Sequence, residues 1–391
     1  MPEAVKRSPA IVFLVFDYFP SRGGTTTQTR LHAIEFLRRG WDVTVLTRRV
    51  PDRLGSERLE GIQVRRIALP GRGRLAKWVD VLASWLWLLR RRRSFTAVSV
   101  IMDADLALAA RAAGLGSSTV LTWVTRGDAT RRLGGRIGRI RRRLLGNCKQ
   151  VVLSPRMETE LRELGIPDVA VIPVPVDTNR FHPPTEIERS QAVRELHLRD
   201  GATVLFVGHL QERKGVDLLI RAFGLVLDAG QDANLVLVGG PIENADHGYM
   251  ELLKGIIHEG ELGDRVVFAG PKDDVAPYMF AADVFCLPSH REGMPNVLLE
   301  AMACGLACVA PASAGGDELL FGSVGVIPPS NSPVDLAHAL IPLLADPDDR
   351  RALGTSAAAR VRSDHQPDRI VDSYEALWHV GSTGLSGEQL I

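Results

Sequence analysis

Cysteine is scarce in this chain, with four in 391 residues, at positions 148, 286, 304 and 308. A disulfide framework is typical of much shorter chains that contain more cysteine, so this low number indicates a reducing compartment. A metal site built on Cys304 and Cys308 would need a second pair of Cys or His ligands at a suitable spacing, and the sequence has none. We therefore interpret the cysteines as buried thiols.

Long apolar runs are also lacking. A helix that crosses a bilayer needs about 20 consecutive apolar residues, and no stretch of the sequence approaches that length. The apolar run Ile11 to Phe16 is too short for a secretory signal and ends at Asp17. The sequence thus predicts a cytoplasmic protein, either free or resting peripherally on the inner face of the membrane.

The chain as a whole has almost no net charge, but each of its halves has a large one. The formal net charge is +1, yet residues 1–180 contain 32 Lys and Arg against 16 Asp and Glu, and the remainder contains 15 against 30. Such an asymmetry suggests two domains with different partners. Because few aromatic residues lie among the arginines and no nucleic-acid-binding motif occurs, nucleic acid is only a minor alternative. An anionic membrane surface or a phosphate-bearing acceptor fits the basic half better.

Short apolar runs alternate with amphipathic segments along the chain. In the first half, Ile11 to Phe16 is followed by the Gly23-Gly24 turn, a predicted helix near Thr26 to Arg39 and a second strand at Val43 to Leu46. The second half has predicted strands at Val204–Val207, Leu235–Val238, Val266–Phe268, Val284–Leu287 and Ala307–Ala310. This alternation predicts an α/β protein with a doubly wound parallel sheet in each half and with ligands beyond the carboxyl ends of the strands.

The most informative segment is Glu292-Gly-Met-Pro-Asn-Val-Leu-Leu-Glu300, which places two carboxylates around the predicted start of a helix. Pro295 suits the first turn, where a missing N–H costs nothing. The start of a helix favours anions because its backbone N–H groups are unsatisfied and the helix dipole is positive there. A phosphate site flanked by two carboxylates suits a ligand that is part diphosphate and part polyhydroxyl, as a nucleotide sugar is.

Four segments together resemble the retaining GT-B glycosyltransferases of family four. The first is Glu292 to Glu300, followed by Ala-Met-Ala-Cys-Gly at 301–305 and by Gly315-Gly316, which is similar to the E-x7-E signature of that family. The others are Phe206-Val-Gly-His-Leu-Gln-Glu-Arg-Lys-Gly215, similar to its donor-phosphate loop, the Gly23-Gly24 loop, and the linker-like segment from Ile172 to Pro183. One such motif occurs by chance in many proteins, but four in this order do not.

The resemblance implies the GT-B architecture, in which two Rossmann-like domains with parallel sheets face each other across a cleft. The predicted domains are an acceptor-side domain of residues 1–182 and a nucleotide-sugar-binding domain of residues 183–365. A C-terminal helix within residues 366–391 would pack back on the first domain.

The resemblance also implies roles in the donor site. Lys214 would neutralise the diphosphate as its bond to the sugar breaks. Glu292 would accept hydrogen bonds from the sugar hydroxyls and Glu300 from the ribose, since a carboxylate can accept from two adjacent hydroxyls. Taken alone, each of these residues would be interpreted as a solvated charge. The remaining predicted donor-binding residues are Gly23, Gly24, His209, Arg213, Gly293, Met294, Pro295 and Asn296.

The sequence departs from the family pattern at two places. His209 stands where the family usually has an arginine, so the diphosphate would depend more on Lys214, with Arg213 as a substitute. Thr125-Arg126-Gly127-Asp128 stands where the family commonly has a His-Gly-x-Asp segment. Arg126 cannot act as a base but can pair with phosphate, so we count Arg126 and Asp128 with Lys214 and Glu292 as candidate catalytic residues.

Two other patterns have competing interpretations. Asp103-Ala-Asp105 matches a D-x-D metal motif, but we expect Asp105 to cap the helix of residues 106–113 and expect no metal. Residues 75–93 have a helical apolar pattern that ends in Arg90 to Arg93, which suits either a helix lying on an anionic membrane through Trp85 and Trp87 or a helix that packs on the sheet. A second basic run, residues 131–143, supports the membrane or a phosphate-bearing acceptor.

The sequence therefore predicts a nucleotide-sugar-dependent glycosyltransferase of the hexosyltransferase type, with retention at the sugar carbon and no cofactor other than the donor substrate. Its acceptor would be a lipid-linked or cell-envelope glycan hydroxyl. The alternatives are a natural-product glycosyltransferase with a soluble acceptor, a GT-B nucleotide-sugar epimerase, and a non-catalytic protein that binds sugar nucleotides.

Overall fold

The computed structural model describes residues 8–21, 23–50, 53–67, 74–196, 199–241 and 247–383. It divides the chain into two compact units, residues 1–175 with 367–391, and residues 176–366. Our sequence-based boundary, between residues 182 and 183, lies further along the chain. Residues 176–182 instead pack with the second unit, because Val176 N donates to His365 O and the Phe181 side chain is buried there.

The sheet of the first unit has the strand order β3-β4-β2-β1-β5-β6-β7-β8 within the described residues. The strands are β1 (Ala10–Leu14), β2 (Asp42–Arg48), β3 (Ser56–Leu59), β4 (Ile62–Ile67), β5 (Ala97–Ile101), β6 (Thr119–Trp123), β7 (Lys149–Val152) and β8 (Val169–Val171). All paired neighbours are parallel except β3 and β4. These two are joined by Glu60 and Gly61, both with positive φ, which suits a tight two-residue hairpin turn. The predicted parallel sheet thus has one antiparallel edge strand.

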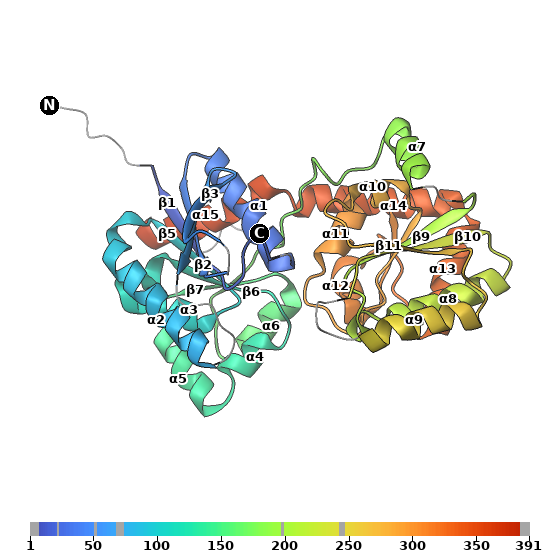
Figure 1. The fold of residues 1–391 in the computed structure, drawn as a ribbon. Coiled ribbons are helices and arrows are strands. Elements are labelled where there is room, and N and C mark those ends of the chain that lie inside the picture. The colour runs from blue at the N-terminus through green and yellow to red at the C-terminus, as the bar shows by residue number, and fades with distance from the viewer. Residues whose placement is uncertain are drawn as a thin grey trace. The chain divides into compact units, whose positions relative to one another are not determined.

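Helices cover both faces of this sheet (Figure 1). The helices α1 (Gly24–Arg38) and α15 (Pro367–Thr383) lie on one face, and α2 (Arg74–Arg91), α3 (Ala104–Ala110), α4 (Asp128–Leu133), α5 (Gly135–Leu145) and α6 (Pro155–Glu163) lie on the other. Arg39 joins α1 to α15 through ion pairs with Asp372 and Glu375 at 2.6 and 2.9 Å. The Tyr374 hydroxyl lies 3.0 Å from that of Thr122 on β6, so the end of the chain packs on the first unit. Residues 384–391 lie outside the described residues.

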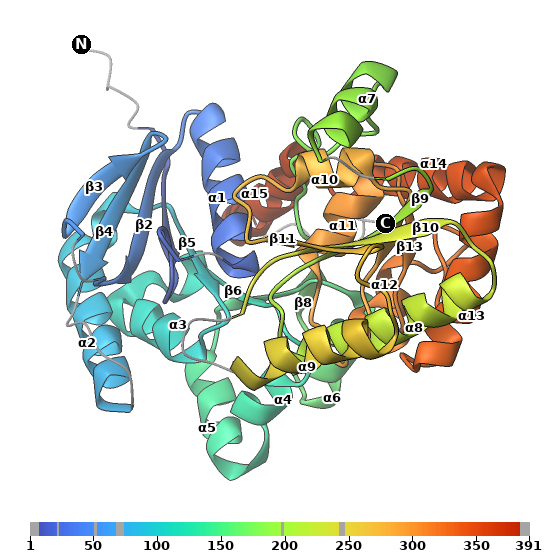
Figure 2. The same cartoon turned by 45° about the vertical axis from the view of Figure 1, so that its right-hand side comes forward.

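The second unit contains a parallel sheet with the order β11-β10-β9-β12-β13. Its strands are β9 (Ala202–Val207), β10 (Ala233–Val238), β11 (Val266–Gly270), β12 (Val284–Cys286) and β13 (Ala307–Val309). Figure 2 shows this sheet between two layers of helices. One layer contains α8 (Val216–Asp228), α9 (His247–Glu259) and α13 (Pro333–Ala345), and the other contains α10 (Ala276–Ala281), α11 (Asn296–Ala303) and α14 (Pro347–Asp364). The helix α7 (Glu186–Glu195) packs against α10.

The predicted α/β class is confirmed, and both sheets are doubly wound. Inner strands such as β5, β6 and β10 are entirely buried, as expected when helices cover both faces of a parallel sheet, whereas the edge strands β3, β8 and β11 are partly exposed. The strand order reverses between β1 and β5 in the first unit and between β9 and β12 in the second. Ligands bind doubly wound sheets at such reversals, beyond the carboxyl ends of the strands. In the part of the chain that the structure describes, no helix is long and apolar enough to span a membrane.

Candidate functional site

Two loops meet where the strand order of the second unit reverses. One follows β9 and leads through a short 3-10 helix (Glu212–Lys214) into α8, and the other follows β12 and leads into α11. Gly215 allows the loops to approach closely: its φ is 65°, and a Cβ atom there would lie 2.3 Å from the carbonyl oxygen of Pro288. Arg213 O also accepts a hydrogen bond from His290 N at 2.9 Å. The backbone thus holds the two predicted site segments side by side.

Lys214 and Glu292 form an ion pair at the centre of this junction. Lys214 Nζ donates to Glu292 Oε1 at 2.6 Å, and the two side chains are only 12% and 11% exposed. Arg213 approaches the other carboxylate oxygen, with 3.2 Å between its Nη1 atom and Glu292 Oε2, and it donates to Arg291 O. The structure therefore brings together three of the residues that the sequence assigned to the donor.

The electrostatics of the pair keep the Glu292 carboxylate charged. Burial by itself would raise the pKa of Glu292, but the charge of Lys214 and its hydrogen bond outweigh burial, and Arg213 adds to the effect, so the pKa lies below its ordinary value. An ionised carboxylate accepts hydrogen bonds only, which suits contact with hydroxyl groups. With Arg213, the junction carries two cations against one carboxylate, so a net positive charge remains for an anionic group.

His209 is also in this loop, and part of its surface is exposed while the rest is buried. Burial of its ring atoms lowers its pKa below the ordinary value, and the charges of Lys214 and Arg213 lower it further. The ring is therefore mainly neutral near pH 7. The fixed positive charge at the junction comes from Lys214 and Arg213.

The helix α11 begins at Asn296, and Pro295 is its N-cap residue, one position before the first turn where the sequence placed it. The backbone at Gly315 passes close to Pro295: a Cβ atom on Gly315, whose φ is 86°, would lie 2.9 Å from Pro295 Cδ. Glu292 N donates to Ser313 O at 3.0 Å, so the segment after β13 supports the loop. Sequence reasoning missed Ser313, although the adjacent Gly315-Gly316 pair marked the segment.

Glu300 lies on α11 and is partly buried. Burial raises its pKa to about 7, while the positive charge of Arg180 opposes burial and the negative charge of Asp177 adds to it. A carboxyl with this pKa is only partly ionised near neutral pH. A ligand that donates hydrogen bonds to it would favour the ionised form. Met294, another predicted donor contact, is buried, with 9% of its surface exposed.

The other predicted site residues belong to the first unit. Gly23 precedes α1, just beyond β1, with an extended backbone (φ 167°), and a Cβ atom there would meet nothing within 4 Å. Neither the fold of the unit nor the backbone conformation requires glycine at this position. Because Gly23 has no side chain, the space next to the start of α1 is open.

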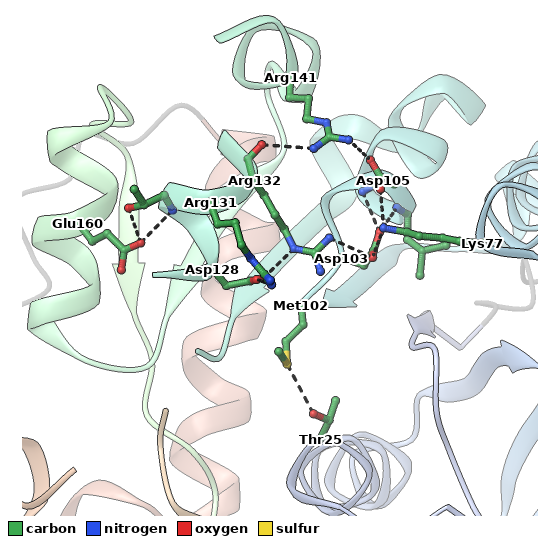
Figure 3. Close-up of polar contacts among 12 residues, drawn as sticks. Thr25, Lys77, Met102, Asp103, Asp105, Asp128, Arg131, Arg132, Arg141 and Glu160 are labelled. Carbon is green, nitrogen blue, oxygen red and sulfur yellow. Dashed lines mark hydrogen bonds and ion pairs between the residues drawn. The ribbon is translucent and has the colours of Figure 1, made fainter. Parts of the chain in front are cut away.

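Asp128 is committed to ion pairs within the first unit (Figure 3). Its side chain is only 5% exposed and accepts hydrogen bonds from Arg131 and, at 2.8 Å, from Arg132. Glu160 caps the start of α4 by accepting from Gly127 N and Thr130 N at 3.0 and 2.9 Å. Arg126 is exposed just before this helix. The geometry favours a structural role for Asp128, whereas Arg126 is accessible to a ligand.

The prediction that Asp105 caps the helix after β5 is wrong. The helix α3 begins at Ala104, and the cap is Asp103, whose Oδ1 atom accepts from Asp105 N and Leu106 N at 2.8 and 2.9 Å. Asp105 instead pairs with Lys77 at 2.6 Å and with Arg141 at 3.3 Å (Figure 3). Sequence reasoning did not foresee these partners, because they come from two other helices. Among the described residues, no group of three or more His, Cys, Asp or Glu side chains is arranged to hold a metal ion.

Two family models match the chain, one in each half. The model described as Glycosyltransferase Family 4 matches residues 22–180, and the model described as Glycosyl transferases group 1 matches residues 201–346. Among solved structures, a sucrose-phosphate synthase from Thermosynechococcus elongatus has the same fold, with a TM-score of 0.78, 24% identity, and 95% of this chain and 98% of that one covered. The fold is therefore GT-B. The chain belongs to the GT-B glycosyltransferases of family 4.

Two relatives indicate the range of the family. A GDP-mannose-dependent monoacylated alpha-(1-6)-phosphatidylinositol monomannoside mannosyltransferase from Corynebacterium glutamicum is 31% identical over 203 residues, which is 49% of this chain and 51% of the relative. A D-inositol 3-phosphate glycosyltransferase from Acidothermus cellulolyticus is 34% identical over 248 residues, which is 59% of this chain and 54% of the relative. The chain thus spans about half the length of the curated relatives it matches.

Proposed function

We propose that this protein is a retaining glycosyltransferase, which moves a sugar from a nucleoside-diphosphate sugar to an acceptor hydroxyl. The observation that supports this proposal most is the ion pair between Lys214 and Glu292 at the strand reversal of the second unit. It presents a cation for the diphosphate and a carboxylate for the sugar hydroxyls at one place, where doubly wound sheets bind ligands.

In the proposed reaction, the bond between the sugar carbon and the diphosphate oxygen breaks as the acceptor oxygen attacks from the same face. The diphosphate takes up the acceptor proton, so no protein base is required, and arginine at position 126 is compatible with turnover. Lys214 and Arg213 stabilise the negative charge that develops on the diphosphate. Glu292 orients the sugar, and Glu300 accepts from the ribose hydroxyls of the nucleoside.

The names of the relatives support a phosphate-bearing acceptor but not one particular compound. One relative is named for a phosphatidylinositol mannoside and the other for inositol 3-phosphate, so lipid-linked and soluble acceptors both occur among related proteins. The basic first half of the chain is consistent with either. The base of the donor stays open in the proposal, and neither a metal nor another cofactor is part of it.

A thermal-shift screen tests the donor half of the proposal. Nucleoside diphosphates and their sugars are added one at a time, and a ligand that binds the folded state raises the melting temperature. We expect one nucleoside diphosphate and a matching sugar nucleotide to do so. If none raises it in a protein that melts cooperatively, the donor assignment is wrong.

Product analysis with the donor from that screen separates the possible activities. Transfer yields a glycoside and a nucleoside diphosphate, and retention is read from the anomeric configuration of the glycoside. A free sugar of altered configuration formed without an acceptor would identify an epimerase. Binding with no product for any phosphate-bearing acceptor would favour the non-catalytic alternative.

A further inference from the structure

The helix α5 exposes three of its four large aliphatic side chains, which is the reverse of a helix that packs on a sheet. Ile137, Ile140 and Leu144 are 71%, 58% and 50% exposed, and their spacing of three and four residues places them on one stripe of the helix. The buried positions of α5 are Gly138 and Leu145. Three large aliphatic side chains in one stripe therefore face away from the core.

Close packing keeps this stripe turned outward. A Cβ atom on Gly138 would lie 2.1 Å from the carbonyl oxygen of Leu133 at the end of α4, so this side of α5 touches backbone directly. Arg142 donates to the same Leu133 carbonyl, and Arg141 pairs with Asp105 at 3.3 Å. The inner side of the helix is thus anchored by Gly138 and by two of its arginines. Rotation of the helix to bury the aliphatic stripe would break these contacts.

A stripe of arginines runs beside the aliphatic one. Arg136, Arg139 and Arg143 each precede one of the exposed aliphatic residues, and all three are exposed. In the described parts of the chain, none of these three forms an ion pair or a side-chain hydrogen bond, in contrast with Arg141 and Arg142. We refer to Arg136, Ile137, Arg139, Ile140, Arg143 and Leu144 as the α5 face.

The helix α2 also exposes apolar side chains. Leu75, Trp78 and Leu82 are 79%, 60% and 55% exposed, at a spacing that again defines one stripe. The two helices are joined through Asp105, whose carboxylate pairs with Lys77 of α2 at 2.6 Å and with Arg141 of α5 (Figure 3). Apolar side chains that are exposed in stripes, and not scattered singly, are typical of an interaction site.

The tryptophans that the sequence assigned to membrane contact are less suitable. Both Trp85 and Trp87 are partly buried, and the Nε1 atom of Trp85 is inaccessible. The ring of Trp87 lies 5.5 Å from that of Phe95, with the guanidinium of Arg91 over it at 4.8 Å. These rings contribute to the packing of α2, so the exposed aliphatic side chains and Trp78 are the better candidates.

We infer that the α5 face binds an anionic lipid surface. Aliphatic side chains enter the interface between head groups and acyl chains, while the arginines beside them contact the lipid phosphates. A complementary protein would have to supply both an apolar groove and acidic groups, whereas an anionic bilayer supplies both properties everywhere. The inference extends the proposed function, which leaves open how the acceptor is presented, and its test needs neither donor nor acceptor.

The test is co-sedimentation of the full chain with vesicles of phosphatidylglycerol and phosphatidylcholine in equal parts, at low salt. The triple variant Arg136→Ala, Arg139→Ala, Arg143→Ala should bind roughly a hundredfold more weakly, since each arginine near an anionic surface contributes about a fivefold factor. The matched control is Arg90→Ala, Arg92→Ala, Arg93→Ala, which removes the same charge from the end of α2 and beyond. We expect it to weaken binding no more than about fivefold.

A second variant, Ile137→Ser with Ile140→Ser, keeps every charge and should weaken binding at least about tenfold, because its apolar insertion is lost. Circular dichroism establishes that each variant is folded. The inference is overturned if the wild type stays in solution with these vesicles, or if both arginine triples weaken binding equally. It is also overturned if the wild type self-associates without vesicles and the serine variant does not, because the α5 face would then be a protein interface.

Discussion

Lys214 and Glu292 bind each other at 2.6 Å, although the proposed reaction assigns them to different parts of the donor. The Glu292 carboxylate contacts the same ammonium group that the diphosphate would contact in the proposed reaction. The donor must therefore share Lys214 with Glu292, or displace Glu292 toward the sugar hydroxyls. This relationship separates the expected effects of the two side chains on binding and on turnover.

The first prediction concerns Lys214. Lys214→Ala should reduce turnover by roughly a hundredfold or more, because a preorganised cation is lost where negative charge develops. Nucleoside diphosphate binding should weaken as well, as measured by calorimetry. Arg213→Ala is the matched control and should have a smaller effect, since its side chain is 45% exposed. A purified Lys214→Ala protein with near-normal rates would exclude the proposed role.

The second prediction concerns Glu292. Glu292→Gln removes the negative charge that competes for Lys214 while it keeps the shape of the side chain. Binding of the nucleoside diphosphate should become tighter by about fivefold, as expected for the loss of about 1 kcal/mol of competing attraction. Turnover with the sugar nucleotide should nevertheless fall by about a hundredfold, because the carboxylate no longer orients the sugar.

Calorimetry with the nucleoside diphosphate and steady-state kinetics with its sugar, done on the same preparation of Glu292→Gln, check these two effects. Weaker binding of the diphosphate would mean that Glu292 supports it rather than competes with it. Unchanged turnover would remove Glu292 from the reaction.

The third prediction is a pH dependence set by Glu300. Its pKa in the folded protein is about 7, above the ordinary value of 4.5, so the folded state holds this proton more tightly than the unfolded state. The contribution of Glu300 to stability is fully present below pH 4.5 and is lost as the pH rises through 7. Glu300→Gln should remove this loss. Urea unfolding of the wild type and of Glu300→Gln, below pH 4.5 and above pH 7, measures this difference in the free energy of unfolding. If the free energy of unfolding depends on pH in the same way in both proteins, the assignment is wrong.

The fourth prediction contrasts two glycines. Gly215→Ala should destabilise the protein by about 3 kcal/mol or more, because alanine would be strained at the positive φ and would clash with the Pro288 carbonyl. Gly23→Ala should change stability by no more than about 0.5 kcal/mol, since its Cβ atom meets open space. If the Gly23 backbone approaches the donor phosphates, as the resemblance to the family implies, the methyl group should still lower turnover by about tenfold or more. Chemical denaturation of both variants measures the changes in stability, and steady-state kinetics measures the change in turnover. Full activity of Gly23→Ala would contradict a contact between the Gly23 backbone and the donor phosphates.

The fifth prediction is that turnover does not depend on a metal ion. The cations available to the diphosphate are Lys214 and Arg213, and Asp103 and Asp105 are engaged by the cap of α3 and by Lys77. Dialysis against a chelator should leave the rate unchanged. Activity that disappears with chelator and returns with magnesium or manganese would contradict this, and Asp105→Asn would then test whether the D-x-D motif holds the ion.

Much of the fold could be predicted from the sequence because its signals are local. An unbroken apolar run such as Val204 to Val207, bounded by turn residues in a chain of alternating elements, favours a buried strand, and it lies within β9. Turn residues were less informative: the antiparallel edge of the first sheet depends on Glu60, whose positive φ is uncommon for that residue. The family signature from Glu292 to Glu300 was equally local, since it lies in one loop and the helix that follows.

Other properties depend on contacts between segments far apart in the chain, and only the tertiary structure decided them. Lys214 and Glu292 are 78 residues apart and pair because β9 and β12 are neighbours at the strand reversal. Asp103 caps α3 because the helix starts earlier than its apolar pattern does. Composition marked residues 131–143 as basic, but only packing against α3 and α4 decides which arginines of α5 are anchored and which are exposed beside Ile137 and Ile140. Burial is a property of neighbours in space, and a linear pattern does not specify them.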